Sequence, residues 1–200
     1  MSTQGAPSND KKQAGGQDEP DNEGGDDAAA PGWPGEPGDH AIGRSRGGLS
    51  TKTHAAVDGR GRPLALIVTA GQAGDSPMLP VLLGAIRVPR VGPGRPRTRP
   101  QAVLADKAYS SKAVRGLLRA RGIKAVIPEP RDQQANRARR GSAGGRPVTY
   151  DTDLYKRRNT VERAFNRMKH WRALATRYDK LALVYRGGVV LAAILTWLKP

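Results

Sequence analysis

The 200-residue chain has no cysteine, one phenylalanine and no long apolar run. Without cysteine, a disulfide framework and a Cys-based zinc site are both excluded. The longest apolar run, Val189–Leu195, is far shorter than the ~20 residues that cross a bilayer, and the N-terminus lacks the charged-then-apolar pattern of a signal peptide. One phenylalanine offers little for stacking the bases of single-stranded nucleic acid. We expect a cytoplasmic protein without a membrane partner.

Charge is divided unevenly along the chain. Residues 1–40 contain nine acids against two lysines, a net charge of −7. Because the whole chain has a net charge of +16, residues 41–200 carry a net charge of +23. Such a surplus favours a nucleic-acid partner over a merely solvated basic surface or a membrane surface. Residues 1–42 are rich in Gly, Asp and Pro and poor in bulky apolar residues, which predicts a disordered acidic tail. We expect this tail to be a linker rather than a segment that mimics nucleic acid and occupies the basic domain.

The middle of the chain alternates strand and helix signals, which is typical of an α/β fold. Asp58-Gly59 between two β-capable runs predicts a hairpin in which Asp58 serves the turn. His54 is expected on a strand, facing solvent or phosphate. Asp75 or Ser76 is expected to cap the next helix. The expected elements are strands at 49–57 and 63–69, a helix to Ile86, a strand at 101–106, a helix to Arg121 and a strand at 123–127.

Two basic stretches, 87–100 and 128–150, contain no apolar periodicity and are expected to be loops. Both suit contacts with phosphates, although a merely exposed linker explains 87–100 as well. The last apolar run, 189–198, is expected to be a helix covering the sheet, with a strand as the alternative.

Residues 155–169 combine a helix pattern with many cations around one acid. At about 100° per residue, Tyr155, Arg158, Glu162 and Lys169 share one helix face. Glu162 is the only acid between Asp153 and Asp179. For an ordinary helix, the simplest explanation is a solvated face with weak i,i+4 pairs.

The spacing Tyr155-x2-Arg158-x3-Glu162-x6-Lys169 resembles the signature of DDE-type insertion-sequence transposases. The resemblance runs from about Gly43 to Leu198 and includes three further stretches, 43–54, Leu104-Ala-Asp106-Lys-Ala-Tyr109 and 171–181. It implies a partial catalytic domain at 43–200, with a ribonuclease-H-like mixed sheet flanked by helices.

The resemblance also implies DNA transposition, the cutting and joining of transposon ends and target DNA. It assigns Asp106 and Glu162 as catalytic carboxylates that bind Mg²⁺ or Mn²⁺, and Tyr155, Arg158 and Lys169 as DNA-binding residues. Two metal ions can stabilise the entering and leaving oxygens of a phosphoryl transfer, and magnesium prefers carboxylate oxygens. It further implies a bacterial, nucleoid-associated protein that forms a homodimer or associates with a transposase product of an upstream reading frame.

The chain departs from the family pattern at the first catalytic Asp. The family places this residue on the first strand of the core, before the stretch that matches Gly43, and no Asp of the acidic tail lies in a strand-like context. We therefore expect a domain that lacks its first strand and carries two of three carboxylates. A non-catalytic DNA-binding regulator of transposition is the alternative, followed by an unrelated basic nucleic-acid-binding protein.

Overall fold

The computed structural model describes residues 40–198. The expected acidic tail therefore lies almost wholly outside the described residues. Within them the fold is mixed α/β, as expected, and no helix is long and apolar enough to cross a membrane.

The predicted hairpin is confirmed. β2 (Gly48–Val57) and β3 (Pro63–Ala70) pair antiparallel, and β1 (Gly43–Ser45) adds a short arm that pairs only with Gly48–Ser50. Asp58 serves the turn, as predicted: its Oδ1 accepts hydrogen bonds from the backbone N–H groups of Arg60 and Arg62, each 2.9 Å long. The carboxylate is thus used to hold a tight turn together.

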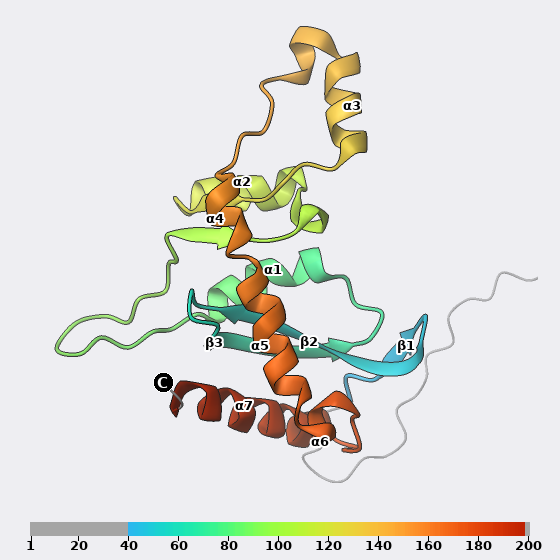
Figure 1. Cartoon of the computed structure of the whole chain (residues 1–200), viewed down its shortest axis with the longest axis vertical. Helices are drawn as coiled ribbons and strands as arrows, with labels where there is room; N and C mark the ends of the chain where they lie inside the picture. The colour runs from blue at the N-terminus through green and yellow to red at the C-terminus, as the bar shows by residue number, and fades with distance from the viewer. Residues whose placement is uncertain (1–39, 199–200) are drawn as a thin grey trace, which may run out of the picture. The chain divides into compact units, whose positions relative to one another are not determined.

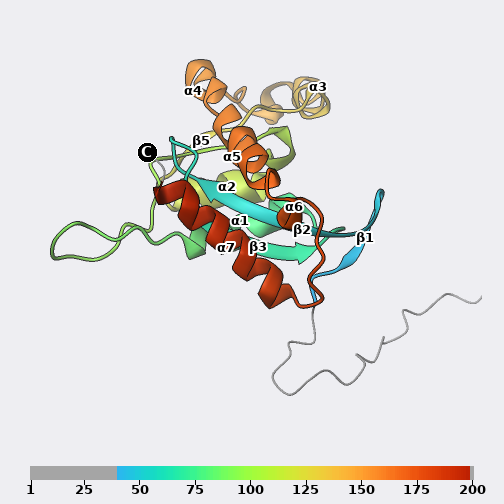
Figure 2. The same ribbon diagram turned by 60° about the horizontal axis from the view of Figure 1, so that its bottom comes forward.

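Helices cover both faces of the β2–β3 pair (Figures 1 and 2). Alternate residues of a strand point to opposite faces, so Ala65 and Ile67 join a core with α1 (Asp75–Ala85), while Leu66 and Val68 join a core with α7 (Ala182–Leu198). The run at 189–198 is therefore part of a helix, as expected.

The second half of the α/β core also follows the predicted order. β4 (Ala102–Leu104) is followed by a short 3₁₀ helix, η1 (Lys107–Tyr109), then α2 (Lys112–Ala120) and β5 (Lys124–Val126), which pairs parallel with β4. Ser111 caps α2 by accepting a 3.2 Å hydrogen bond from the Val114 N–H. Gly122, at φ 63°, supplies the left-handed residue that ends the helix.

The strands form two sheets where one mixed sheet was expected. Within residues 40–198, β1-β2-β3 and β4-β5 are not joined by strand pairing. They nevertheless share one apolar core, to which α1 contributes Leu79, Leu82 and Leu83 and α2 contributes Val114 and Leu118. Burying each such side chain contributes about 1.5–3 kcal/mol. Side-chain packing, rather than backbone hydrogen bonding, therefore holds the two sheets to one another.

The stretch 128–150, expected as a loop, instead contains α3 (Arg131–Arg139) and a 3₁₀ turn, η2 (Gly141–Gly144). No residue of α3 is buried, so the helix has no apolar stripe by which its sequence could be recognised. The other loop, 87–100, closes on itself through two backbone hydrogen bonds between Val88 and Arg97, 2.9 and 2.8 Å long.

Candidate active site

Glu162 lies in the first turn of α5 (Asn159–Lys169), a helix that packs against β2 and crosses it in Figure 1. Its Oε1 accepts a 2.7 Å hydrogen bond from Nη2 of Arg158, four residues earlier. The Arg158 guanidinium in turn lies 5.8 Å from the centre of the Tyr155 ring. Arg158 therefore interacts with two of the other three signature residues, Tyr155 and Glu162.

The signature does not lie on one continuous helix. Tyr155 belongs to α4 (Thr152–Lys156), and residues 157 and 158 separate α4 from α5. At the junction the backbone bonds run from residue i to i−3, as in Arg158 N–H to Tyr155 O (2.8 Å) and Val161 N–H to Arg158 O (3.0 Å). This tightening is typical of helix ends, and because both junction residues keep right-handed helical backbone angles, Tyr155 remains beside Arg158.

Asp106 lies two residues after β4, at the carboxyl end of the strand where α/β proteins place ligands. Its side chain is exposed, and Oδ1 caps η1 by accepting a 2.9 Å hydrogen bond from the Ala108 N–H. The carboxylate also acts on the signature residues: the pKa of Arg158 is raised, first by the hydrogen bond to Glu162 and further by the charges of Tyr155 and Asp106. Arg158 therefore lies within electrostatic reach of both carboxylates.

Tyr109 lies within electrostatic reach of Asp106 and of a third carboxylate, that of Asp75. Burial raises the pKa of Tyr109 to about 12, and the negative charges of Asp75 and Asp106 add to the rise. The Tyr109 hydroxyl is therefore protonated at neutral pH and available as a hydrogen-bond donor beside two acids.

The expectation that Asp75 or Ser76 caps α1 is wrong. Asp75 is the first residue of the helix, and its Oδ1 lies 3.3 Å from Nζ of Lys52 and 3.4 Å from Nδ1 of His54, both on β2. The N-cap position falls to Gly74, which makes no side-chain cap bond. Two basic groups on the facing strand thus hold this carboxylate, which explains why it is turned away from the backbone N–H groups.

His54 is buried, with 4% of its surface exposed, so the expectation that it faces solvent or phosphate is wrong. Its Nε2 lies 2.8 Å from Oγ1 of Thr69 on β3, which is two residues beyond the cross-strand partner of His54. Burial lowers the pKa of His54; Asp75 partly offsets this, and Lys52 lowers it further. At neutral pH the ring is therefore uncharged and links β2, β3 and the start of α1.

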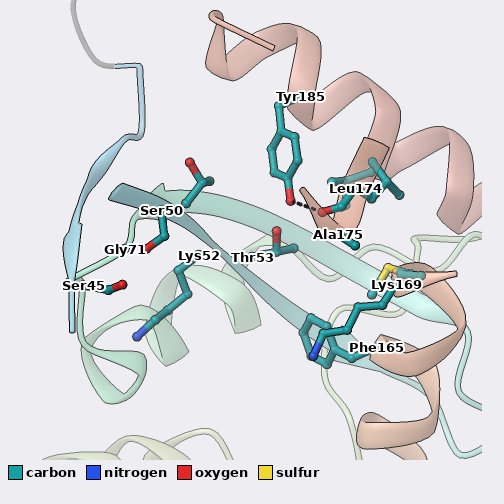
Figure 3. Close-up of a pocket in the computed structure, with 13 residues that line it drawn as sticks. Ser45, Ser50, Lys52, Thr53, Gly71, Phe165, Lys169, Leu174, Ala175 and Tyr185 are labelled. Carbon is teal, nitrogen blue, oxygen red and sulfur yellow. Dashed lines mark hydrogen bonds between the residues drawn. The ribbon is translucent and has the colours of Figure 1, made fainter. Parts of the chain in front are cut away.

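Lys169 lies two helical turns from Glu162, about 10 Å along the axis, and lines a cavity of about 430 Å³ (Figure 3). Four consecutive residues of β2, 50–53, line the same cavity. Because consecutive strand residues point to opposite faces, the cavity opens on the edge of β2 rather than on one face. Its apolar side comes from α5, α6 (Arg172–Ala175) and α7, where the Tyr185 hydroxyl donates a 3.0 Å hydrogen bond to the Leu174 carbonyl.

The donor chemistry at this end of the core suits a hard cation, since Asp106 and Glu162 offer carboxylate oxygens. One oxygen of each is already engaged, by the Ala108 N–H and by Arg158. Within residues 40–198, no group of three or more His, Asp or Glu side chains is placed to hold a metal ion. The described part of the chain thus offers one acid bonded to the Arg158 guanidinium and a second within its electrostatic reach, without a third ligand in place.

Sequence reasoning missed three residues around this site. Tyr109 appeared only as a neighbour of Asp106, Asp75 only as a helix cap, and His54 only as an exposed strand residue. One signal was present in the sequence. Lys52 and His54 are two residues apart on β2 and therefore lie on the same face of the strand, where two basic groups can attract an acid at the start of the following helix.

Comparison with known proteins is consistent with the resemblance seen in the sequence. A family described as "Transposase DDE domain" matches residues 20–197. A putative transposase for insertion sequence element IS6501 from Brucella ovis is 33% identical over 151 residues, which cover 76% of this chain and all of the relative. A putative transposase for insertion sequence element IS402 from Burkholderia cepacia is 33% identical over 148 residues, which cover 74% of this chain and 62% of that relative. No solved structure matches the chain. The chain thus belongs to the family of insertion-sequence transposases with a DDE domain.

Proposed function

We propose that residues 43–200 form a partial DDE catalytic domain that serves DNA transposition by binding transposon-end duplex DNA. The observation that carries the proposal is the meeting of Tyr155, Arg158 and Glu162 within electrostatic reach of Asp106. The charge of +23 on residues 41–200 supports a polyanionic partner. Residues 1–42 would then be an acidic tail outside the catalytic domain.

In this proposal Asp106 and Glu162 hold Mg²⁺ or Mn²⁺, which when bound polarises the phosphoryl group to be attacked. Arg158, already positioned by Glu162, presents a planar guanidinium suited to a phosphate near the cut end. Lys169 supplies a point charge farther along α5, and Tyr155 orients Arg158 through its ring. Arg158 also competes with a metal for Glu162, so metal binding requires the guanidinium to turn toward DNA.

We further propose that the core is ribonuclease-H-like and that its first strand belongs between β2 and β4. Two observations support this. On the side of β2 away from β3, β1 pairs only as far as Ser50, and no strand within residues 40–198 pairs with Thr51–Val57. β4 likewise has only β5 as a partner among the described strands. The family's first catalytic Asp would enter the site on that strand.

A non-catalytic regulator is the second candidate, favoured by the incomplete set of metal ligands among residues 40–198. Such a protein would bind element ends and compete with an active transposase there. The two candidates differ in whether cleavage appears once the first strand is supplied.

The test compares the 200-residue chain with a fusion that adds an upstream Asp-bearing strand, using DNA that flanks the coding sequence as substrate. We expect the chain alone to show no Mg²⁺-dependent cleavage above background, and the fusion to cut. Glu162→Gln in the fusion should abolish cutting with DNA binding retained, because charge is lost without a change of shape. The matched control, Asp153→Asn, removes an exposed acid of α4 and should cut normally.

Two results would decide against the proposal. Mg²⁺-dependent cutting by the chain alone would show that its metal site is complete without the added strand. A fusion that binds DNA and never cuts would favour the regulator.

A further inference from the structure

A second cavity, of about 480 Å³, lies between α5 and the turn that joins β2 to β3. Its charged lining consists only of basic side chains, with no carboxylate among the lining residues. The residues that line it are Gly59, Arg60, Thr160, Arg163, Asn166, Arg167 and His170. A concave surface with several guanidinium groups and hydroxyl and amide side chains is suited to a phosphate.

This cavity is separate from the face that bears the transposase signature. At about 100° per residue, Arg163, Arg167 and His170 lie between about 80° and 140° around the α5 axis from Glu162. The helix is only about 10–12 Å across with its side chains. One ligand that extends beyond a single phosphate can therefore contact both faces of α5.

Internal hydrogen bonds hold part of the cavity in place. Nη2 of Arg167 donates to the Gly61 carbonyl (3.1 Å), and Nη2 of Arg163 donates to Oγ1 of Thr160 (3.3 Å). Gly61 has φ +80°, and a Cβ at that position would lie 2.5 Å from Nη2 of Arg167. The positive φ favours glycine at this position. The hydrogen bond to the turn positions one of the arginines before any ligand arrives.

The nearest acids are engaged elsewhere. Asp58, in the same turn, is bound by Arg62 through both the backbone N–H and the guanidinium, with Nη2 2.6 Å from Oδ2. Glu162 is bound by Arg158 on the other face of the helix. The positive charge in the cavity is therefore not neutralised by the acids around it.

We propose that this cavity binds a backbone phosphate of duplex DNA, at a second position beyond the signature residues. The inference rests on the proposed DNA-binding function and extends it: the duplex crosses α5, with one contact at Arg158 and Lys169 and another at Arg163 and Arg167. Phosphate contacts of this kind position a protein on DNA without reading its sequence. The second contact therefore fixes how the duplex approaches the carboxylates.

The experiment measures the affinity of the full chain for a short duplex of arbitrary sequence by fluorescence anisotropy, between about 50 and 200 mM salt. The variant Arg163→Gln/Arg167→Gln removes both guanidinium groups that would hold the phosphate in this cavity. The control Lys112→Gln/Arg119→Gln removes the same charge from exposed positions on α2, outside both faces of α5.

Losing this one phosphate contact lowers the slope of log K against log salt by about 0.9 in the double variant. Over this fourfold rise in salt, its affinity should then fall about 3.5-fold less than that of the wild type. The slope for the control should differ from that of the wild type by less than about 0.45, half the value for one contact. Arg163→Gln alone, which leaves the Arg167 bond to the hairpin intact, should lose about half as much slope as the double variant.

Equal slopes for the double variant and its control would overturn the second contact while leaving DNA binding in place. If the wild type itself does not bind duplex DNA, both this inference and the proposed function fail. Calorimetric titration with inorganic phosphate alone tests whether the cavity binds free phosphate instead of DNA. If the wild type binds phosphate saturably and the double variant loses this binding while its DNA affinity is unchanged, the cavity is a site for free phosphate and its assignment to DNA is overturned.

Discussion

Arg177 is half-buried, and replacing it with methionine should destabilise the domain more than any single change at an exposed cation. Arg177 follows α6 and donates four hydrogen bonds: to the carbonyls of Asp179 and Lys180 in its own loop, and to Ala41 O and Thr51 Oγ1 at the start of the described chain. Its guanidinium also lies 5.3 Å from the centre of the Tyr185 ring. One side chain thus ties the loop before α7 to β2.

The magnitude follows from which acceptors can reach water. The Lys180 bond is exposed, and its carbonyl can be hydrated after the change. The bonds to Ala41 and Thr51 are partly buried, and a bond from a charged donor contributes about 1.5–3 kcal/mol. Because Thr51 still donates to Ala41 O (2.6 Å), the lower figure applies to both. Two bonds at about 1.5 kcal/mol each, with about 0.5–1 kcal/mol from the ring contact, give a loss of about 3.5–4 kcal/mol.

Urea unfolding followed by circular dichroism measures this loss as a shift in midpoint at constant m-value. Arg177→Lys should lose about half as much, since an ammonium can keep one or two of the bonds. Arg172→Met, an exposed arginine on α6, is the matched control and should stay within about 0.5 kcal/mol of the wild type. A loss for Arg177→Met no larger than that of the control would refute the reasoning.

Two further predictions concern pH and the tail. The folded-state pKa of His54 is lowered, so below the ordinary value of 6.5 the unfolded chain binds a proton that the folded chain refuses. The free energy of unfolding should therefore be highest above pH 6.5 and fall as the pH drops toward the folded-state pKa. Comparing urea midpoints at successive pH values should show this fall reduced in His54→Gln; an identical pH profile would exclude His54 as its source. Deleting residues 1–40 removes a net charge of −7 and should tighten binding to duplex DNA at low salt, which anisotropy can measure. Unchanged or weaker binding would show that the tail does not compete with DNA.

Local signals predicted the core elements well. Asp58-Gly59 predicted the hairpin because Asx-Gly is typical of tight turns, although the residue with positive φ in this turn is Gly61 rather than Gly59. Ser111 predicted the start of α2 because its hydroxyl can satisfy an orphan N–H. α3 was missed because nothing in it is buried, and a helix without an apolar stripe looks like a polar loop.

The candidate site was harder to predict because it depends on contacts between distant elements. The helical spacing of Tyr155, Arg158 and Glu162 predicted correctly that they lie close together. The break between α4 and α5 at residues 157–158 gives no signal in the sequence. The burial of His54 depends on α1 packing over β2, and the role of Asp75 depends on that burial. The assignment of Asp106 and Glu162 as metal ligands remains a prediction, because it comes from the family resemblance and not from the geometry of the two side chains.

The open edge of β2 has a consequence for handling the protein. Backbone N–H and C=O groups along Thr51–Val57 that lack a strand partner among the described residues can template pairing with any extended segment, including the same edge of a second molecule. Lys52 lies within this stretch, and the high positive charge of the domain makes two copies repel. Added salt screens that repulsion. The conditions that weaken DNA binding are therefore also those in which purified protein should begin to aggregate through its unpaired strand.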